Sequence, residues 1–364
     1  MAQADILTVD RLIDHVSTVP AIAGEPVQLF VREKARASLA HAASGEVSAD
    51  KILLFVHGGY WPCVNGFDLQ YRDYSWMEAL AAAGYDVFAM DMTGYGFSSR
   101  PFMDDPANLP PDDQDFLIPR TLAEQCPATH PVKLVTSDSE TDDIDRVVDF
   151  ICALRGVDRI NLLGWSGGGI RTGTYTVRHQ EKVEKLIIFA SSNYDRANPD
   201  DPPETLPEPG HPMTFQTRAV GIDQRWGGTV KSEGQVEPGV PEIVWKQTVA
   251  TDPVGASWGP GGLRAPTRTY WGWNAKSAAK IRVPVLIMVG EFDRLLPSNI
   301  ELFEDLGTDR KVFVEIKGAS HFMQWERQRH ILHRGSREWL ESASVAGAAS
   351  GRLVADLSGN IAAA

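Results

Sequence analysis

One short stretch near the middle of the chain constrains its fold more than any other. The apolar run at residues 160–163 stops at the letters GWSGGG, so four glycines surround Ser166. Glycine has no Cβ, and it is therefore the usual residue where the backbone turns sharply or where another segment approaches closely. The pattern predicts a buried strand, a tight turn that presents Ser166, and a helix that begins at the glycines.

Further apolar runs alternate with helix-like segments on both sides of this turn. Runs that predict strands lie at residues 26–33, 51–59, 85–96, 183–192, 283–293 and 311–321. Segments with helical periodicity lie at residues 74–84, 139–156 and 326–342. Continuous apolar strands are buried on both faces, so we expect an α/β fold with a mostly parallel sheet covered by helices on both faces.

Two stretches interrupt this alternation. Residues 100–137 are rich in Pro and Asp, and residues 193–276 are rich in Pro, Gly and Trp without strong periodicity. Long irregular insertions in compact domains usually serve as lids or binding loops. We expect a discontinuous α/β core over 1–192 and 277–345, a cap over 193–276 above the carboxyl ends of the strands, and a mobile tail over 346–364.

Charge and composition narrow the class of partner. The chain has 364 residues and a net charge of -13, so it repels phosphate backbones and we expect no nucleic-acid partner. No apolar run approaches the roughly 20 residues that span a bilayer. No basic segment precedes an apolar one at the N-terminus, which predicts a cytoplasmic protein. Three cysteines do not indicate a disulfide scaffold, although a Cys63–Cys126 pair is left open.

No motif indicates a cofactor or a metal. The chain has no G-x-G-x-x-G at the start of a βαβ unit, and the glycines at 167–169 lack the lysine of a phosphate-binding loop. His330 and His333 share a helix face, but no further metal ligands accompany them. The acidic clusters lack the spacing of a calcium loop.

Three side chains form a candidate catalytic set. The turn satisfies G-x-S-x-G between a predicted strand and a predicted helix, the context that this motif requires. A serine hydroxyl is a weak nucleophile and needs a base with an orienting acid. Asp293 ends the run 283–293, and His321 follows the next strand, so both lie where loops of parallel strands converge with Ser166. Glu291 and Asp195 are the alternative acids.

Together these motifs resemble the α/β-hydrolase superfamily, in its serine esterase and lipase-like members with a cap. The resemblance covers most of residues 50–342. It rests on HGG at 57–59, DMTGYGFSS at 91–99, GWSGG at 164–168, GEFDRLLP at 290–297 and GASHF at 318–322. It implies Ser166 as the nucleophile, Asp293 as the acid and His321 as the base.

The resemblance also implies an oxyanion hole made of two backbone N–H groups. The N–H of Gly167, at the start of the helix, is one donor. The HGG motif leads into the other, which belongs to Gly59 or, nearly as well, to Tyr60. His57 is expected to fix that turn rather than to act in catalysis.

The substrate is less constrained than the chemistry. The predicted cap carries many aromatic residues and no evident cluster of Arg or Lys, so we favour a small-molecule carboxylic ester with a hydrophobic or aromatic group. A lactone is the nearest rival, a meta-cleavage-type C–C bond is third, and a non-catalytic ligand-binding relative is the alternative of another class. A homodimer is left open. The candidate substrate-binding residues are Trp165, Trp226, Trp245, Trp271 and Trp273.

Overall fold

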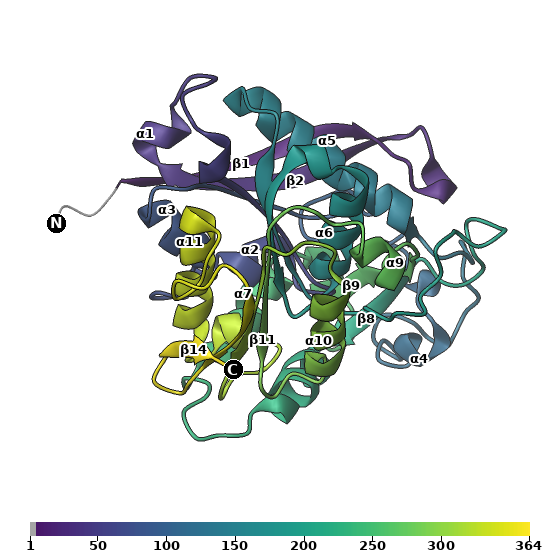
Figure 1. Cartoon of the computed structure of the whole chain (residues 1–364). Helices are drawn as coiled ribbons and strands as arrows, with labels where there is room; N and C mark the ends of the chain where they lie inside the picture. The colour runs from purple at the N-terminus through teal and green to yellow at the C-terminus, as the bar shows by residue number, and fades with distance from the viewer. Residues whose placement is uncertain (1–4) are drawn as a thin grey trace.

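The computed structural model describes residues 5–364, so the first four residues of the predicted core lie outside it, and its centre is a ten-stranded sheet (Figure 1). The strand order is β1-β2-β4-β3-β6-β7-β11-β12-β13-β14. The strands from β4 to β13 in this order run parallel: β4 (Asp86–Met90), β3 (Ile52–Val56), β6 (Ile160–Trp165), β7 (Val183–Phe189), β11 (Val285–Gly290), β12 (Lys311–Ile316) and β13 (Gly351–Ala355). This confirms the prediction of a mostly parallel sheet.

Antiparallel strands close the two edges of the sheet. The hairpin of β1 (Ile6–Val16) and β2 (Pro26–Arg36) pairs with β4 at one edge, and β14 (Ile361–Ala363) pairs with β13 at the other. The prediction of a mobile tail is therefore wrong. Leu353 and Ala355 alternate inward and are buried, and this short period-two pattern adds β13 to the sheet.

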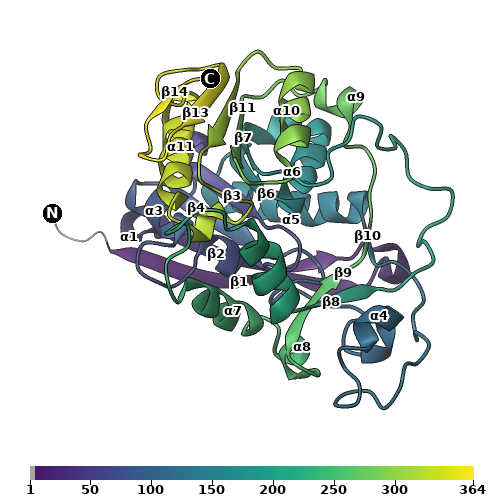
Figure 2. The same ribbon diagram turned by 90° about the horizontal axis from the view of Figure 1, so that it is seen from below.

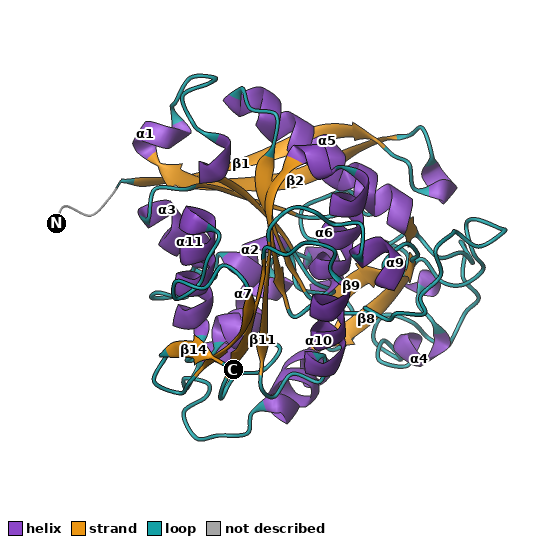
Figure 3. Ribbon diagram, viewed as in Figure 1, coloured by secondary structure: helices purple, strands orange, loops and turns teal. Residues whose placement is uncertain are grey.

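Alternate residues of the buried strands face opposite sides of the sheet. In β3, Phe55 joins one hydrophobic cluster and Leu54 joins another. Residues of α2 (Cys63–Phe67), α3 (Trp76–Ala82), α7 (Val240–Val249) and α11 (Arg329–Ser342) belong to the first cluster. Residues of α5 (Ser137–Arg155), α6 (Gly167–Arg178), α9 (Ala275–Ala278) and α10 (Leu296–Asp305) belong to the second. Helices thus flank both faces, as the sequence predicts (Figure 3).

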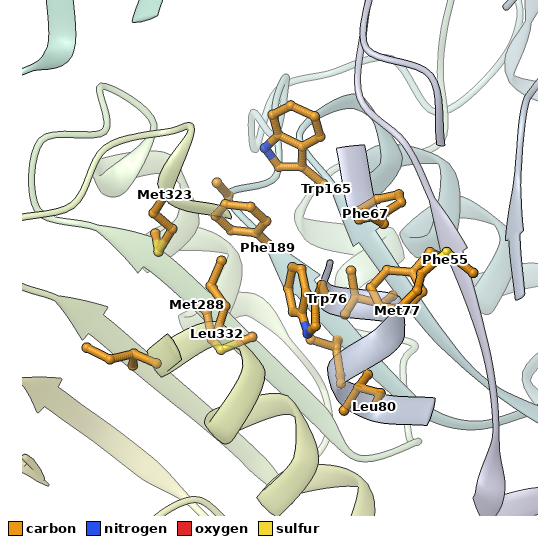
Figure 4. Packing of buried hydrophobic residues seen from close by; sticks show 14 of the residues in the cluster. Phe55, Phe67, Trp76, Met77, Leu80, Trp165, Phe189, Met288, Met323 and Leu332 are labelled. Carbon is orange, nitrogen blue, oxygen red and sulfur yellow. The ribbon is translucent and has the colours of Figure 1, made fainter. Parts of the chain in front are cut away.

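Aromatic side chains of the first cluster, among them Phe55, Trp76, Phe189 and Trp165, lie near one another in Figure 4. The Trp76 ring meets Phe55 and Phe189 edge-on, with centroids 5.4 and 5.9 Å apart, and its Nε1 donates to Ser336 Oγ at 2.9 Å. Phe189 stacks in turn on Trp165 at 6.1 Å. The residue before Ser166 is therefore fixed by the core.

Residues 100–137 and 193–276, the two irregular stretches of the sequence, pack on each other. Together they are called the second layer below. The residues from β7 to β11 contain β8 (Met213–Thr217) and β9 (Gly262–Pro266), which pair antiparallel, and β10 (Arg268–Thr269), which pairs parallel with β5 (Val135–Thr136). Figure 2 shows α4 (Pro111–Gln114) beside β8 and β9. A separate hydrophobic cluster joins the two stretches through Met103, Leu109, Leu117, Leu134, Met213, Phe215 and Trp258.

Short helices complete the chain. They are α1 (Ala37–Ala40), α8 (Pro253–Ser257), the π-helix η5 (Ala219–Trp226) and the 3₁₀ turns η1 (Pro20–Ile22), η2 (Ala49–Lys51), η3 (Pro106–Asn108), η4 (Gln180–Lys182), η6 (Gly227–Thr229) and η7 (Met323–Trp325). No helix within residues 5–364 is long and apolar enough to cross a membrane. Cys63, Cys126 and Cys152 all carry free thiols, so Cys63 and Cys126 do not pair here.

Candidate active site

Ser166 occupies a strained turn between β6 and α6. Its φ of 55° and ψ of -116° lie outside the regions that a residue with a side chain adopts freely. The flanking glycines make the turn feasible, because a Cβ at Gly164 would lie 2.2 Å from Gly168 O and a Cβ at Gly168 would lie 2.0 Å from Val56 O. Ser166 N donates to Phe189 O at 2.9 Å, which ties the turn to the neighbouring strand. The glycine cluster therefore holds the serine in one backbone conformation.

Asp293 and His321 meet at the ends of two adjacent parallel strands. Asp293 follows β11 and His321 follows β12, and His321 Nδ1 lies 2.8 Å from Asp293 Oδ2. The Asp293 side chain is fully buried, and its Oδ1 accepts from Leu295 N at 2.9 Å. Both carboxylate oxygens thus have a donor, and these hydrogen bonds fix the carboxylate against the imidazole.

Neither alternative acid reaches His321. Glu291 accepts from Lys317 Nζ at 3.2 Å and from Gly318 N at 3.0 Å, and these two donors lower the pKa of its carboxyl. Asp195 accepts from Ala197 N at 2.8 Å within its own loop. The geometry leaves Asp293 as the carboxylate that contacts the histidine.

Ser166, His321 and Asp293 border one cavity of about 530 Å³. Gly59, Tyr60, Gly167 and Trp165 line the same cavity, so seven of the residues selected from the sequence come together here. Within residues 5–364 no hydrogen bond joins Ser166 Oγ to His321. Such hydrogen bonds are often long in an enzyme without ligand and shorten when substrate binds.

The three candidate oxyanion donors line the same cavity as Ser166. Among the described residues, the N–H groups of Gly59, Tyr60 and Gly167 have no hydrogen-bond acceptor, although each residue lines the cavity. Gly59 N lies 3.5 Å from the position that a Cβ on Gly167 would occupy. The Gly59 and Gly167 backbones therefore face one small region beside the serine.

His57 has a different environment from His321. It is fully buried, its Nδ1 lies 2.5 Å from Gly58 O, and its Nε2 accepts from Met92 N at 3.2 Å. Burial is the main cause that holds the pKa of His57 well below its ordinary value, and the positive charge of the Arg171 guanidinium lowers this pKa further. A neutral ring fixed at both nitrogens fits a residue that holds the turn.

Glu326 supports the His321 loop, and sequence reasoning missed it. Its Oε2 accepts from Ser320 N at 2.9 Å, and its Oε1 accepts from the Ser320 hydroxyl at 2.5 Å and from Trp226 Nε1 at 3.0 Å. The carboxyl is buried, and this burial raises its pKa. No motif marks Glu326, because its role depends on side chains that only the fold brings together.

The structure corrects the expectation about the tryptophans. Trp165 borders the cavity and donates to His321 O at 3.1 Å, but the other four do not line it: Trp226, Trp245, Trp271 and Trp273. Trp226, Trp271 and Trp273 are buried, and Trp245 packs half-buried on the first hydrophobic cluster. Trp226 and Trp245 pack with the first cluster and Trp273 with the second, so these apolar surfaces hold the second layer onto the core.

Aromatic residues other than these four tryptophans line the cavity. Trp61, Tyr95 and Phe322 line it together with Tyr60. Trp61 follows the HGG motif closely and Phe322 follows His321, so nearness to the motifs was the available signal.

The cavity is also more cationic than the sequence suggests. Arg225, Arg268 and Arg294 line it, whereas Asp293 is the one carboxylate on the wall that residues 5–364 form. The expectation of no arginine cluster is wrong, because β10 and η5 bring two distant arginines of the second layer to the same cavity.

The chain belongs to the α/β-hydrolase fold family. The model of that family, described as alpha/beta hydrolase fold, matches residues 51–328, a span that includes Ser166, Asp293 and His321. This confirms the resemblance that the sequence motifs indicate. No curated protein matches the chain.

Solved structures share the fold at low sequence identity. A 2-hydroxy-6-oxo-6-phenylhexa-2,4-dienoate hydrolase from Rhodococcus sp. is similar with a TM-score of 0.53 and 14% identity, over 93% of this chain and 100% of its own. A thermophilic esterase from Thermogutta terrifontis has a TM-score of 0.51 and 16% identity, over 91% and 98%. A naproxen esterase from Bacillus subtilis has a TM-score of 0.50 and 14% identity, over 91% and 92%. Identities this low show the fold alone.

Proposed function

We propose that the protein is a serine hydrolase that cleaves a carboxylic ester of a small molecule through an acyl-enzyme intermediate. One observation carries the proposal: the Asp293–His321 contact of 2.8 Å borders the same cavity as the strained Ser166. A nucleophile, an orienting acid and a base in this chain order match the arrangement that α/β-hydrolases use for acyl transfer.

In the first half of the reaction Ser166 Oγ attacks the ester carbonyl. His321 Nδ1 donates to Asp293, which leaves Nε2 as the base that accepts the serine proton. The buried Asp293 carboxylate then stabilises the imidazolium that forms. His321 returns the proton to the leaving alcohol, and the acyl group stays on Ser166.

Two backbone N–H groups stabilise the charge that develops on the carbonyl oxygen. Gly167 supplies one at the start of α6, and Gly59 supplies the other, since its nitrogen lies 3.5 Å from the position that a Cβ on Gly167 would occupy. In the second half of the reaction His321 takes a proton from water as the water oxygen attacks the acyl carbon. The bond to Ser166 Oγ then breaks, His321 returns the proton to Ser166 Oγ, and the acid leaves.

The second layer serves as the cap in this proposal. Residues 193–276 contribute Thr214, Arg225, Pro266 and Arg268 to the cavity wall. A cavity of about 530 Å³ lies within the range of small-molecule sites. Residues 100–137 support this cap from outside through the shared hydrophobic cluster.

Labelling with a fluorophosphonate, followed by peptide mapping, tests the proposal. The expected result is one adduct on the peptide that contains Ser166 and loss of the adduct in Ser166→Ala. Ser192→Ala is the matched control, because Ser192 lines the same cavity and should leave the labelling of Ser166 intact. An unlabelled protein, or an adduct on Ser192, would contradict the assignment.

The substrate class is tested by a hydrolysis screen over nitrophenyl esters of increasing chain length, aromatic esters and lactones. Ester turnover that is lost in Ser166→Ala supports the proposal. Turnover of lactones alone would redirect it to a lactonase with the same nucleophile.

A further inference from the structure

One edge of the Arg268 guanidinium is hydrogen-bonded to Glu140, whereas its Nη1 lies at the cavity. Its Nε and Nη2 donate to Glu140 Oε2 at 3.0 and 2.6 Å. Its Nη1 has no protein acceptor within residues 5–364, and it lies 3.3 Å from the position that a Cβ on Gly167 would occupy. Arg268 lines the cavity, so the free N–H groups are beside the proposed oxyanion donor.

The charges behind Arg268 do not cancel. Glu140 is buried and shared between two arginines, since its Oε1 accepts from the fully buried Arg171 Nε at 2.7 Å. The remaining N–H groups of Arg171 reach His57 O at 2.7 Å and the Tyr95 hydroxyl at 3.3 Å. Two guanidinium groups thus face one carboxylate, and the surplus positive charge is directed at the cavity through Arg268.

The rest of the wall adds positive charge. Arg225, which lies over the Tyr60 ring at 5.3 Å, and Arg294 are exposed residues of the same cavity. Asp293 is already engaged by His321. The cavity is therefore cationic on a chain whose net charge is -13, and this local contrast favours an anionic ligand.

We propose that Arg268 binds a carboxylate of the substrate next to the ester bond, so that the enzyme is selective for esters that carry a free carboxylate. The guanidinium presents N–H groups in a planar fork that suits carboxylate oxygens. Glu140 holds the opposite edge, so Arg268 is oriented before substrate binds. This inference rests on the proposed function, because it names the substrate class of the Ser166 site.

Matched ester pairs test the proposal. For the acyl side, the mono-4-nitrophenyl ester of adipic acid is compared with 4-nitrophenyl hexanoate. For the alcohol side, 4-carboxyphenyl butyrate is compared with 4-carbamoylphenyl butyrate. We expect the wild-type enzyme to have a higher kcat/KM for the carboxylate member of at least one pair. Equal or lower kcat/KM for the carboxylate members of both pairs would overturn the proposal.

Variants connect the preference to Arg268. Arg268→Met should lower kcat/KM for the preferred carboxylate ester by about 30-fold or more, the usual size of a lost hydrogen bond to a charged group, and change the neutral ester by less than about 3-fold. Arg268→Lys should restore part of the preference. Arg218→Met is the control, because it removes a positive charge of the same segment that Asp223 and Glu242 already pair. Equal losses for both esters in Arg268→Met would show a structural role instead.

A second readout separates this inference from the proposed function. Adipate, but not adipamide, should slow fluorophosphonate labelling of Ser166 in the wild type, and Arg268→Lys should weaken this protection. If Ser166 is labelled but adipate gives no protection, the inference fails and the nucleophile stands. If Ser166 is not labelled, the proposed function fails, and binding of adipate measured by calorimetry then decides whether the anion site exists. Absence of binding would overturn it.

Discussion

The sheet layer and the second layer of this molecule place their functional groups in different ways. In the sheet layer, which is the ten-stranded sheet with its flanking helices, Ser166, Asp293 and His321 lie beyond the carboxyl ends of β6, β11 and β12. The ends of these parallel strands therefore set their spacing. In the second layer Arg268 depends on contacts across the chain, since β10 pairs with β5 and the guanidinium binds Glu140. Changes in the sheet layer should therefore affect turnover of every substrate, whereas changes in the second layer should alter which substrate is preferred.

Replacing the serine gives the largest expected effect and tests the sheet layer as a whole. Ser166→Ala should lower kcat/KM for every ester by roughly 10⁴- to 10⁶-fold, because the attacking oxygen is lost. The thermal midpoint should change little, since the Ser166 hydroxyl makes no hydrogen bond to His321. Circular dichroism checks the fold. A purified variant with more than a few per cent of wild-type activity would disprove the assignment.

Neutralising the Asp293 carboxylate should have the next largest effect on turnover after Ser166→Ala. Asp293→Asn should lower kcat by about 10³- to 10⁴-fold, because an amide cannot stabilise the imidazolium or fix the ring tautomer. Added to Ser166→Ala it should cost little more, since the three residues act as one unit. Glu291→Gln and Asp195→Asn are matched controls, and near-normal kcat is expected in both. Loss of activity in a control with retention in Asp293→Asn would reassign the acid.

A buried tryptophan tests whether the second layer contains structural residues distinct from its specificity residues. The Trp273 ring lies where a Cβ on Gly173 would stand, so it packs directly on α6. Trp273→Ala should lower the free energy of unfolding by about 3–5 kcal/mol and leave the ratio of kcat/KM for carboxylate and neutral esters unchanged. Trp245→Ala should lower the free energy of unfolding by less, because Trp245 is only half-buried. A changed ratio without loss of stability would make Trp273 a specificity residue.

The smallest expected effect is that of changing Glu326, which supports the His321 loop. Both Glu326 oxygens accept hydrogen bonds, so Glu326→Gln must place an amide N–H₂ against the Ser320 or Trp226 donor. We expect about a 10-fold loss of kcat, because small displacements of a catalytic base are costly, together with a lower thermal midpoint. Glu326→Asp, which retains the charge, should recover part of the kcat. Unchanged kcat with a lower midpoint would leave Glu326 with a role in stability only.

The sheet layer was largely predictable because its signals are local. The apolar run before Ser166, the glycines around it and the runs before Asp293 and His321 are short patterns, and each determines its own strand and turn. The parallel sheet then follows, because buried strands that alternate with helices have few other arrangements.

The second layer was less predictable because composition does not report position. Tryptophan is suited equally to a pocket wall and to a core, and four of the five selected turn out to be packed away from the cavity. Arg268 reaches the cavity through a strand pair that joins residues about 130 positions apart, and no local pattern encodes this. The strand β13 was missed because its inward residues, Leu353 and Ala355, stand among small residues that resemble a flexible tail.

The acyl-enzyme on Ser166 is the central claim, and rapid quenching tests it most directly. The enzyme is mixed with the nitrophenyl ester that it hydrolyses fastest, quenched in acid within the first turnovers, digested and examined by mass spectrometry. The account predicts an added acyl mass on the peptide that contains Ser166, absent from Ser166→Ala under the same conditions. An acyl mass on any other peptide, or ester hydrolysis that continues at the wild-type rate in Ser166→Ala, would contradict it.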